Sequence, residues 1–341
     1  MRRWRGWLAP PVALMLVMAA AFGAAACGDD GGDDDGDGAP ADSTATASAE
    51  GTFVPTPDPV AYPATVTDML GREVRIDAKP ERIAALSPTT VELVYAVGGE
   101  SVTRSSSVDT PEEATAATDI GPSYQPNLEL ITAQDPDIII ADSVLQPQLL
   151  EQLEGLGVPV VYAGAQSFAE VLTAFETVGA AIDKNAEAEE AAAATLNTLT
   201  VLTTRLPGYQ PKVLVVNGAP TDFFAAKPES YVGDLVRLLA GDNVAAGQPD
   251  VGRFPGYTKL SLEAIVAAQP DVVLAITAGP PGGTTITEEL SSNPAWASLP
   301  AVQNNRVHEI DMEVYLQAPG PRAAQAVDEL SKLLYPEVFG P

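Results

Sequence analysis

The side chains best suited to bind a small molecule gather in stretches that the sequence predicts to be loops. Tyrosine and phenylalanine rings there offer flat apolar walls for a large planar or chelated ligand, and two arginines could meet an anionic one. Each ring could equally anchor its own loop, and each arginine could pair with a surface carboxylate. The candidate ligand-binding residues are Ser87, Arg104, Tyr124, Phe223, Phe224, Ser230, Tyr231, Arg253, Tyr257, Tyr315 and Gln317.

Metal binding and catalysis by the protein itself find little support in the residue types present. The 341-residue chain has one histidine, His308, and one cysteine, Cys27. These counts exclude HExxH-type sites, an intramolecular disulfide and cysteine-rich metal sites. No GxGxxG follows a predicted strand, and the GxxxxGK[ST] and GxSxG motifs do not occur. We expect no catalytic residue, no protein-held metal and no resident cofactor; any iron or cobalt would arrive inside its own chelator.

Charge and length narrow the class of protein further. Only 18 Lys and Arg oppose 46 Asp and Glu, which gives a formal net charge of −28. Such a chain offers no basic surface for a phosphate backbone, so nucleic-acid binding is not expected. Its length is roughly twice that of an ordinary domain, which predicts two compact lobes.

The N-terminal segment predicts export and membrane attachment. Arg2, Arg3 and Arg5 precede an almost uncharged run over residues 8–26, which is typical of a secretory signal. The run ends in AAAC with Gly28 after it, and this resembles the lipobox of bacterial lipoproteins, in which Cys27 would be lipidated. An uncleaved membrane anchor is the alternative. Either way, the rest of the chain is expected outside the cytoplasmic membrane and tethered to it.

The next segment predicts a spacer between the membrane and the folded part. Six aspartates interleave with glycine over residues 29–37, and Ala, Ser, Thr and Pro continue to Pro59. This composition has too little apolar surface to offset chain entropy, so residues 27–61 are expected to be disordered. The acidic run also lacks the spacing of an EF-hand calcium loop.

An internal duplication indicates how the folded part is built. Residues 128–137 (LELITAQDPD) and 262–271 (LEAIVAAQPD) match, and each is followed by a fully apolar run. An unbroken β-branched run is typical of a strand buried on both faces of a parallel sheet. Upstream, predicted strands over residues 82–86 and 212–216 are each followed by a predicted helix. This repeated order predicts two similar α/β lobes.

A helical stretch separates the two predicted lobes. Ser167 and Glu170 have capping-box spacing, and we expect Gly179 and residues 183–185 to interrupt the helix that they begin. A long Ala-rich helix then runs over residues 186–206. The predicted organisation is a signal peptide at 1–26, a linker at 27–61, a first lobe at 62–165, helices at 166–208 and a second lobe at 209–341.

Several short segments, taken together, resemble the substrate-binding lipoproteins of ABC importers for cobalamin and ferric siderophores. They are residues 66–74 (VTDMLGREV), 79–89 (KPERIAALSPT), 305–307 (NRV) and 319–322 (PGPR). The resemblance extends over about residues 62–337. It implies the helical-backbone, class III periplasmic binding protein fold: two Rossmann-like α/β lobes joined by a single long α-helix, with a ligand cleft between them.

The same resemblance suggests how the protein would meet its transporter. In that family one glutamate on each lobe docks into arginine pockets of the permease, and Glu129 and Glu263 occupy the matching positions. Two exposed carboxylates on separate lobes would form a two-point contact with a basic permease rim. The alternative is that each glutamate only favours its helix N-terminus, behind Asn127 or Ser261.

The resemblance implies a monomeric binding protein that captures a ferric siderophore or cobalamin and delivers it to an ABC importer permease with its ATPase. A haem- or oxyanion-binding lipoprotein of the same fold is an alternative. A surface sensor or adhesion protein and a hydrolase are alternatives of other classes, because fold does not determine function. The sequence does not choose among the ligands.

Overall fold

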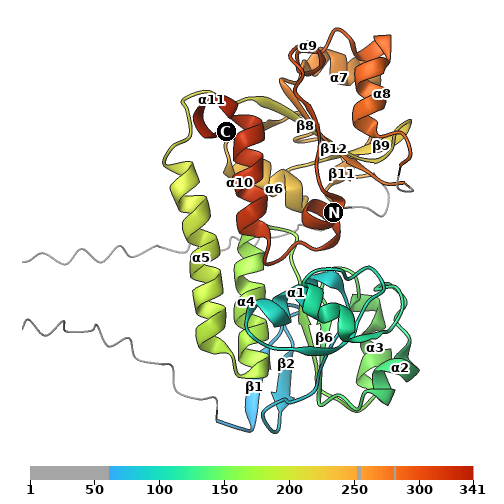
Figure 1. Cartoon of the computed structure of the whole chain (residues 1–341), viewed down its shortest axis with the longest axis vertical. Helices are drawn as coiled ribbons and strands as arrows, with labels where there is room; N and C mark the ends of the chain where they lie inside the picture. Colours follow the sequence, from blue (N-terminus) through green and yellow to red (C-terminus); the bar gives the residue numbers. More distant parts are fainter. Residues whose placement is uncertain (1–60, 252–254, 280–281, 341) are drawn as a thin grey trace, which may run out of the picture. The chain divides into compact units, whose positions relative to one another are not determined.

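The computed structural model describes residues 61–251, 255–279 and 282–340 (Figure 1). The predicted signal peptide, Cys27, nearly all of the predicted linker and Arg253 lie outside these residues. None of the described helices is both long and apolar enough to cross a membrane. The lobe boundaries themselves stay a prediction, although the strands fall into two separate sheets.

The first sheet has five parallel strands in the order β5-β4-β3-β6-β7. Every residue of β6 and β7 is buried, as the apolar run after residue 137 predicted. Helices α1 (Pro88–Ala96), α2 (Leu128–Ala133) and α3 (Leu150–Glu154) connect the strands, and a hairpin of β1 (Ala64–Thr67) and β2 (Glu73–Ile76) precedes them. The strands are β3 (Ile83–Ala85), β4 (Ser101–Arg104), β5 (Thr118–Asp119), β6 (Ile138–Asp142) and β7 (Val160–Ala163).

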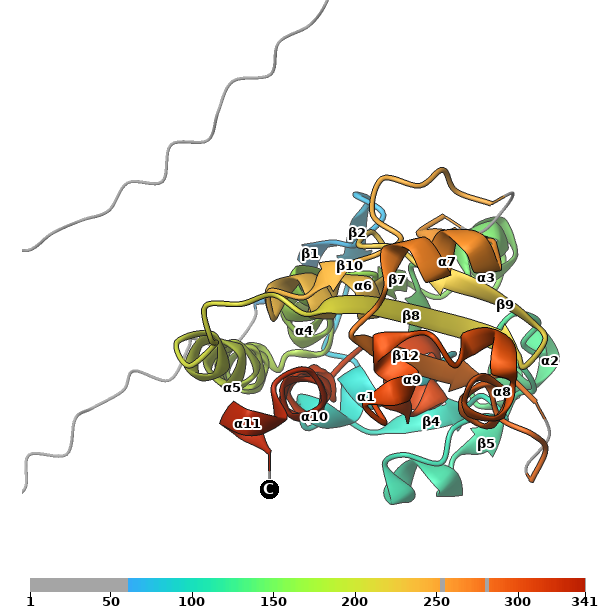
Figure 2. The ribbon, with the colours of Figure 1, turned by 90° about the horizontal axis from the view of Figure 1, so that it is seen from above.

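The second sheet is mixed and follows the order β11-β9-β8-β12-β13, with β10 also paired to β8. Strands β8 and β12 lie side by side in parallel at its centre (Figure 2), and β9 returns antiparallel to β8. Its strands are β8 (Lys212–Ala219), β9 (Asp222–Ala226), β10 (Asp242–Asn243), β11 (Tyr257–Thr258), β12 (Val272–Thr277) and β13 (Val307–Glu309). Its helices are α6 (Tyr231–Leu238), α7 (Leu262–Ala268), α8 (Ile286–Ser292) and α9 (Pro300–Gln303).

The duplicated segments have the same structural role in both sheets. Each forms a short helix, α2 or α7, and its Pro-Asp pair then leads into the neighbouring strand. The Asp137 carboxylate accepts hydrogen bonds from the backbone N–H groups of Glu81 and Arg82, at 2.8 and 3.0 Å. The Asp271 carboxylate accepts one from the N–H of Lys212, at 2.8 Å. In each half the repeated aspartate therefore fixes the start of the opening strand, which confirms the predicted duplication.

Two packed helices connect the sheets. Helix α4 (Phe168–Ile182) begins behind Ser167, whose hydroxyl accepts from Glu170 N, and α5 (Asn185–Thr203) follows after Asp183 at φ 59°. The prediction that Gly179 interrupts the helix is wrong. A Cβ at Gly179 would lie 2.4 Å from the Ala188 Cβ, so the glycine lets α4 and α5 approach closely. Helix α5 also packs on α10 (Ala323–Leu334).

The interior continues through these helices. One large core cluster packs one face of each sheet against apolar faces of α1, α4, α5, α6 and α10. The other face of each sheet is covered by a smaller cluster of its own. The α/β halves thus share a helical core, and residues of both halves meet next to the carboxyl ends of the first sheet.

Candidate functional site

The carboxyl ends of the first sheet open onto a pocket of about 450 Å³, here called the main pocket. Ligands of open α/β sheets bind at such strand ends. Loops after β3, β4, β5 and β6 supply most of its wall, and a π-helical turn of the second half, η4 (Glu313–Gln317), supplies the rest. The lining residues are Pro88, Ser106, Ser107, Pro122, Ser123, Tyr124, Leu145, Leu316 and Gln317.

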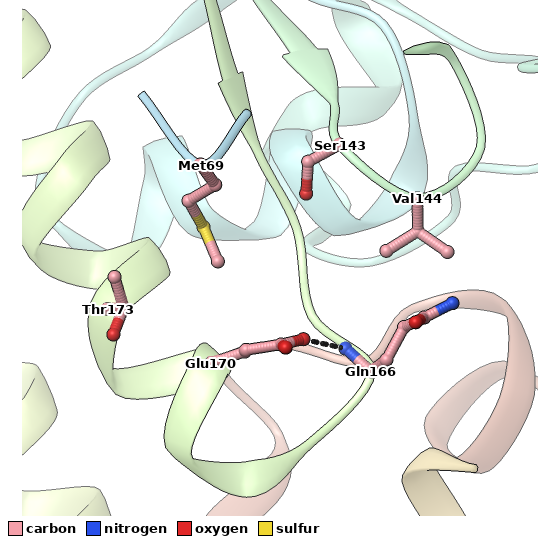
Figure 3. Close-up of a pocket in the computed structure, with 6 residues that line it drawn as sticks. All are labelled: Met69, Ser143, Val144, Gln166, Glu170 and Thr173. Carbon is pink, nitrogen blue, oxygen red and sulfur yellow. Dashed lines mark hydrogen bonds between the residues drawn. The ribbon is translucent and has the colours of Figure 1, made fainter. Parts of the chain in front are cut away.

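Two further hollows adjoin the main pocket through shared walls. A narrow one of about 40 Å³ shares Leu145, Leu316 and Gln317 with it and is also lined by Asp142. The next, of about 350 Å³, shares Val144 with the narrow one and is more polar (Figure 3). In this polar hollow Glu170 Oε2 accepts a 2.6 Å hydrogen bond from Gln166 N. A crevice therefore follows the strand ends from β4 to β7.

The loops that form the floor of this crevice are held by a buried aspartate at the end of β6. Asp142 Oδ2 accepts a 2.9 Å hydrogen bond from the Ser87 hydroxyl, and Oδ1 accepts from Val144 N and Leu145 N. Burial raises the pKa of Asp142 despite these donors. Ser87 itself is fully buried as the N-cap of α1. Its predicted ligand contact is therefore replaced by a structural role beneath the pocket.

Some predicted contact residues line the main pocket and others are buried in the core. Tyr124 lines the pocket with 71% of its surface exposed, and Gln317 lines it from the opposite half. Tyr231 and Tyr315 are instead buried in the core. The Tyr315 hydroxyl donates to the Ala326 carbonyl at 3.1 Å and contacts the Glu329 carboxylate. The prediction that Tyr231 and Tyr315 lie in ligand-facing loops is wrong, because Tyr231 begins α6, Tyr315 lies in η4, and both side chains are buried in the core.

The other second-half candidates also lie away from the main pocket. Phe223 and Phe224 are on strand β9, not in a loop, because β8 and β9 form a tight hairpin in which Ala219 pairs with Asp222. Phe223 packs against Trp296 with ring centroids 6.1 Å apart, and Lys259 Nζ lies 4.8 Å from the Phe224 ring centroid. Phe223 lines a separate surface groove.

Ser230 and Tyr257 are placed by local structure as well. The Ser230 hydroxyl accepts from Gly233 N as the N-cap of α6, and its residue is buried. Tyr257 pairs with Ala226 in the sheet, and burial raises the pKa of its hydroxyl to about 12. Neither side chain lines the pockets at the strand ends.

Of the two predicted cations, the structure describes Arg104, which does not line the main pocket. The Arg104 guanidinium donates to the carbonyls of Thr115 and Ser105, both at 3.2 Å, and lies 3.5 Å from the Asp119 carboxylate. It therefore holds the loops of its own half together, and its proximity to Asp119 matches the carboxylate pair that the sequence analysis gave as the alternative. Arg253 lies outside the described residues.

The two predicted docking glutamates occupy equivalent and exposed positions. Glu129 is in the first turn of α2, where the Asn127 side chain caps Glu129 N and Leu130 N. Glu263 is in the first turn of α7 behind Ser261, and hydrogen bonds from its own N–H and the Ser261 hydroxyl lower its pKa. Both carboxylates are thus placed at capped helix starts and remain accessible to a partner.

Residues 61–251, 255–279 and 282–340 contain no group of three or more His, Cys, Asp or Glu able to hold a metal ion. His308 pairs with Leu274 in the sheet, and burial lowers its pKa.

The sequence prediction did not select several residues that line the crevice. Ser106, Ser123 and Leu145 line the pockets although they were not among the predicted contacts. Glu92 and Arg322, which join the two halves, were missed altogether. A glutamate within the apolar run VELV of α1 was the available signal.

Comparison with known proteins assigns the fold to a family. The periplasmic binding protein family matches residues 83–314. The ABC transporter substrate-binding lipoprotein YvrC of Bacillus subtilis is 25% identical over 288 residues, 82% of this chain and 87% of its own. The Fe(3+)-citrate-binding protein YfmC of the same organism is 27% identical over 220 residues, 63% of this chain and 67% of its own.

A solved structure agrees with this relationship. The ABC transporter substrate-binding protein from Listeria monocytogenes aligns with a TM-score of 0.65 at 25% identity, over 76% of this chain and all of that chain. The two-lobed α/β fold predicted from the sequence is therefore confirmed. The family match spans more than half of the chain, and the chain belongs to the periplasmic binding protein family, among the substrate-binding proteins of ABC importers.

Proposed function

We propose that this protein captures a metal chelate, a ferric siderophore or cobalamin, outside the cytoplasmic membrane and delivers it to an ABC importer permease with its ATPase. The main pocket supports this proposal most directly. Tyr124, Leu145, Leu316 and two prolines give it broad apolar walls, and serines with Gln317 add hydrogen-bonding groups. Such a mixture suits a bulky ligand whose metal is already coordinated.

The named relatives support the same ligand class. YfmC is described as binding Fe(3+)-citrate, and a 26%-identical protein of Halobacterium salinarum, aligned over 62% of this chain and 58% of its own, is described as binding cobalamin. Both are metal chelates. The proposal assigns no catalytic activity, because the relatives named here are described as binding proteins.

The proposal includes attachment and docking. Lipidation of Cys27 would tether the monomer to the membrane, and residues 27–61 would let the folded part reach the permease. Glu129 and Glu263 would contact basic residues of the permease, since both are exposed at equivalent places in the two halves. Replacing Cys27 with Ser should abolish incorporation of labelled palmitate into the protein if Cys27 carries the lipid.

A binding panel tests the ligand class. The purified full chain would be titrated calorimetrically with ferrichrome, Fe(III)-citrate, cyanocobalamin, hemin and molybdate, and examined after purification for co-purified chromophores. Stoichiometric binding of ferrichrome, Fe(III)-citrate or cyanocobalamin, with the chelate recovered unchanged, is expected. Binding of hemin or molybdate alone would assign the protein to the alternative classes, and no binding at all would contradict the proposal.

A further inference from the structure

A buried ion pair joins the two halves of the molecule beside the main pocket. Glu92 of α1 accepts two hydrogen bonds from Arg322, which precedes α10: Nε to Oε2 at 3.0 Å and Nη2 to Oε1 at 2.7 Å. The Glu92 and Arg322 side chains are only 3% and 18% exposed. A bidentate arginine–carboxylate contact fixes orientation as well as distance, so the pair defines how Arg322 sits on α1.

The same guanidinium also contacts the turn that forms the second-half wall. Arg322 Nη2 lies 3.1 Å from Glu313 Oε1 at the start of η4. Asp109, from the first half, faces Glu313 and raises its pKa together with burial. The Tyr231 hydroxyl of α6 is buried in the same region and makes no hydrogen bond. Arg322 therefore contacts two carboxylates, and Glu92 is the more buried of the two.

The residues that make these contacts flank, in the sequence, the segment that forms the second-half wall of the main pocket. Glu313 and Arg322 stand at the two ends of the segment 313–322, and Leu316 and Gln317 between them line the main pocket. Within this segment Gly320 runs close to α1: a Cβ there would lie 3.8 Å from the Thr89 Cγ2. Arg322 thus forms one end of this segment, contacts Glu313 at the other end, and pairs with Glu92 of the first half.

We propose that Glu92 and Arg322 are positioning residues for ligand binding: their ion pair fixes the 313–322 segment against the first half and so sets the shape of the main pocket. This inference rests on the proposed function of that pocket. A buried pair is weak evidence for stability alone, because desolvation offsets much of its attraction. Because this pair holds the ends of a pocket wall, we expect its loss to speed ligand dissociation.

Binding of a named probe tests the positioning role. Whichever of ferrichrome, Fe(III)-citrate, cyanocobalamin and hemin binds the wild type would be measured with Arg322→Gln, Arg322→Lys and the control Lys332→Gln, which breaks an exposed pair with Asp328 on α10. Arg322→Gln should weaken affinity about ten-fold, mainly through faster dissociation. Arg322→Lys keeps the charge and should recover part of that loss, and Lys332→Gln should bind as the wild type does.

Hydrogen exchange followed by mass spectrometry gives a second measurement that needs no ligand. Arg322→Gln should speed exchange in residues 313–322 and leave β12 at the wild-type rate. Wild-type exchange in 313–322, faster exchange throughout both halves, or unchanged affinity despite local loosening would each overturn the positioning role. If the wild type binds none of the probes, the proposed function fails, and exchange still decides whether the pair fixes the segment. If Arg322→Gln does not fold, Arg322→Lys, which loses the bidentate contact with Glu92, carries the same comparison with a smaller expected loss of affinity.

Discussion

Glu92 should make the stability of this protein depend on pH in a way that one substitution removes. Burial raises the pKa of its carboxyl from 4.5 to about 7, and Glu313 and Asp109 add to the effect while Arg322 opposes it. Between these pH values the unfolded chain ionises Glu92 and the folded chain keeps its proton, so the contact with Arg322 is a full ion pair only above about pH 7. Stability from this group is therefore fully present below pH 4.5 and is lost as pH rises through about 7.

The size of the effect follows from the two pKa values. Each pKa unit is worth about 1.4 kcal/mol, so the free energy of unfolding should fall by about 3 kcal/mol through Glu92 between pH 4.5 and 8. Glu92→Gln cannot ionise and keeps an oxygen to accept from Arg322. The free energy of unfolding of Glu92→Gln minus that of the wild type should therefore become more positive by about 3 kcal/mol over this range.

Urea unfolding followed by far-UV circular dichroism at half-unit pH intervals would measure this difference. Glu187→Gln is a suitable control, because a 2.9 Å hydrogen bond from Lys184 lowers the pKa of Glu187. The contribution of Glu187 is present above its ordinary pKa and is lost only as pH falls below it, so its curve should run parallel to the wild type from pH 4.5 to 8. A parallel curve for Glu92→Gln as well would refute the assigned burial effect.

Three further predictions concern the pocket and the docking residues. Reversing both Glu129 and Glu263 to Arg should abolish uptake of labelled ligand by cells while calorimetric affinity stays unchanged; normal uptake would remove the docking role. Tyr124→Ala should weaken ligand binding about ten-fold with an unchanged melting temperature, because its ring is largely exposed. Tyr315→Phe should lower the free energy of unfolding by about 1 kcal/mol through loss of its two hydroxyl contacts, with ligand affinity preserved; weaker binding instead would return Tyr315 to the site.

The fold was accessible from the sequence where one physical cause dominates. Runs such as residues 138–140 and 272–274 are apolar on both faces, which is typical of strands in a sheet covered on both sides. The repeated Pro-Asp pair predicted a common unit, although not the hydrogen bonds by which Asp137 and Asp271 fix the opening strands. Gly179 shows the limit, since a glycine that breaks a helix and one that lets two helices touch are the same residue type.

The sequence indicates the region of the candidate site better than its side chains. The general rule that ligands bind at the carboxyl ends of strands points to the edge of the first sheet, where the structure has a crevice. It does not say which way a given ring points. Tyr124 and Tyr315 look equivalent in predicted loops, yet one lines the main pocket and the other is 1% exposed in the core. Side-chain direction depends on local turns such as η4, which the pattern of apolar residues in the sequence does not predict.

The ion pair between Glu92 and Arg322 shows what a single sequence does reveal about such contacts. A glutamate between Val91 and Leu93 on a buried helix face must find a compensating group or keep its proton, because an unpaired buried charge is costly. The sequence therefore signals that a partner exists. It does not identify that partner: 46 acidic residues compete for 18 basic ones, and Arg322 lies 230 positions away. Only the meeting of α1 with the end of the second half selects it, so the residue that ties the pocket wall in place becomes visible with the tertiary structure.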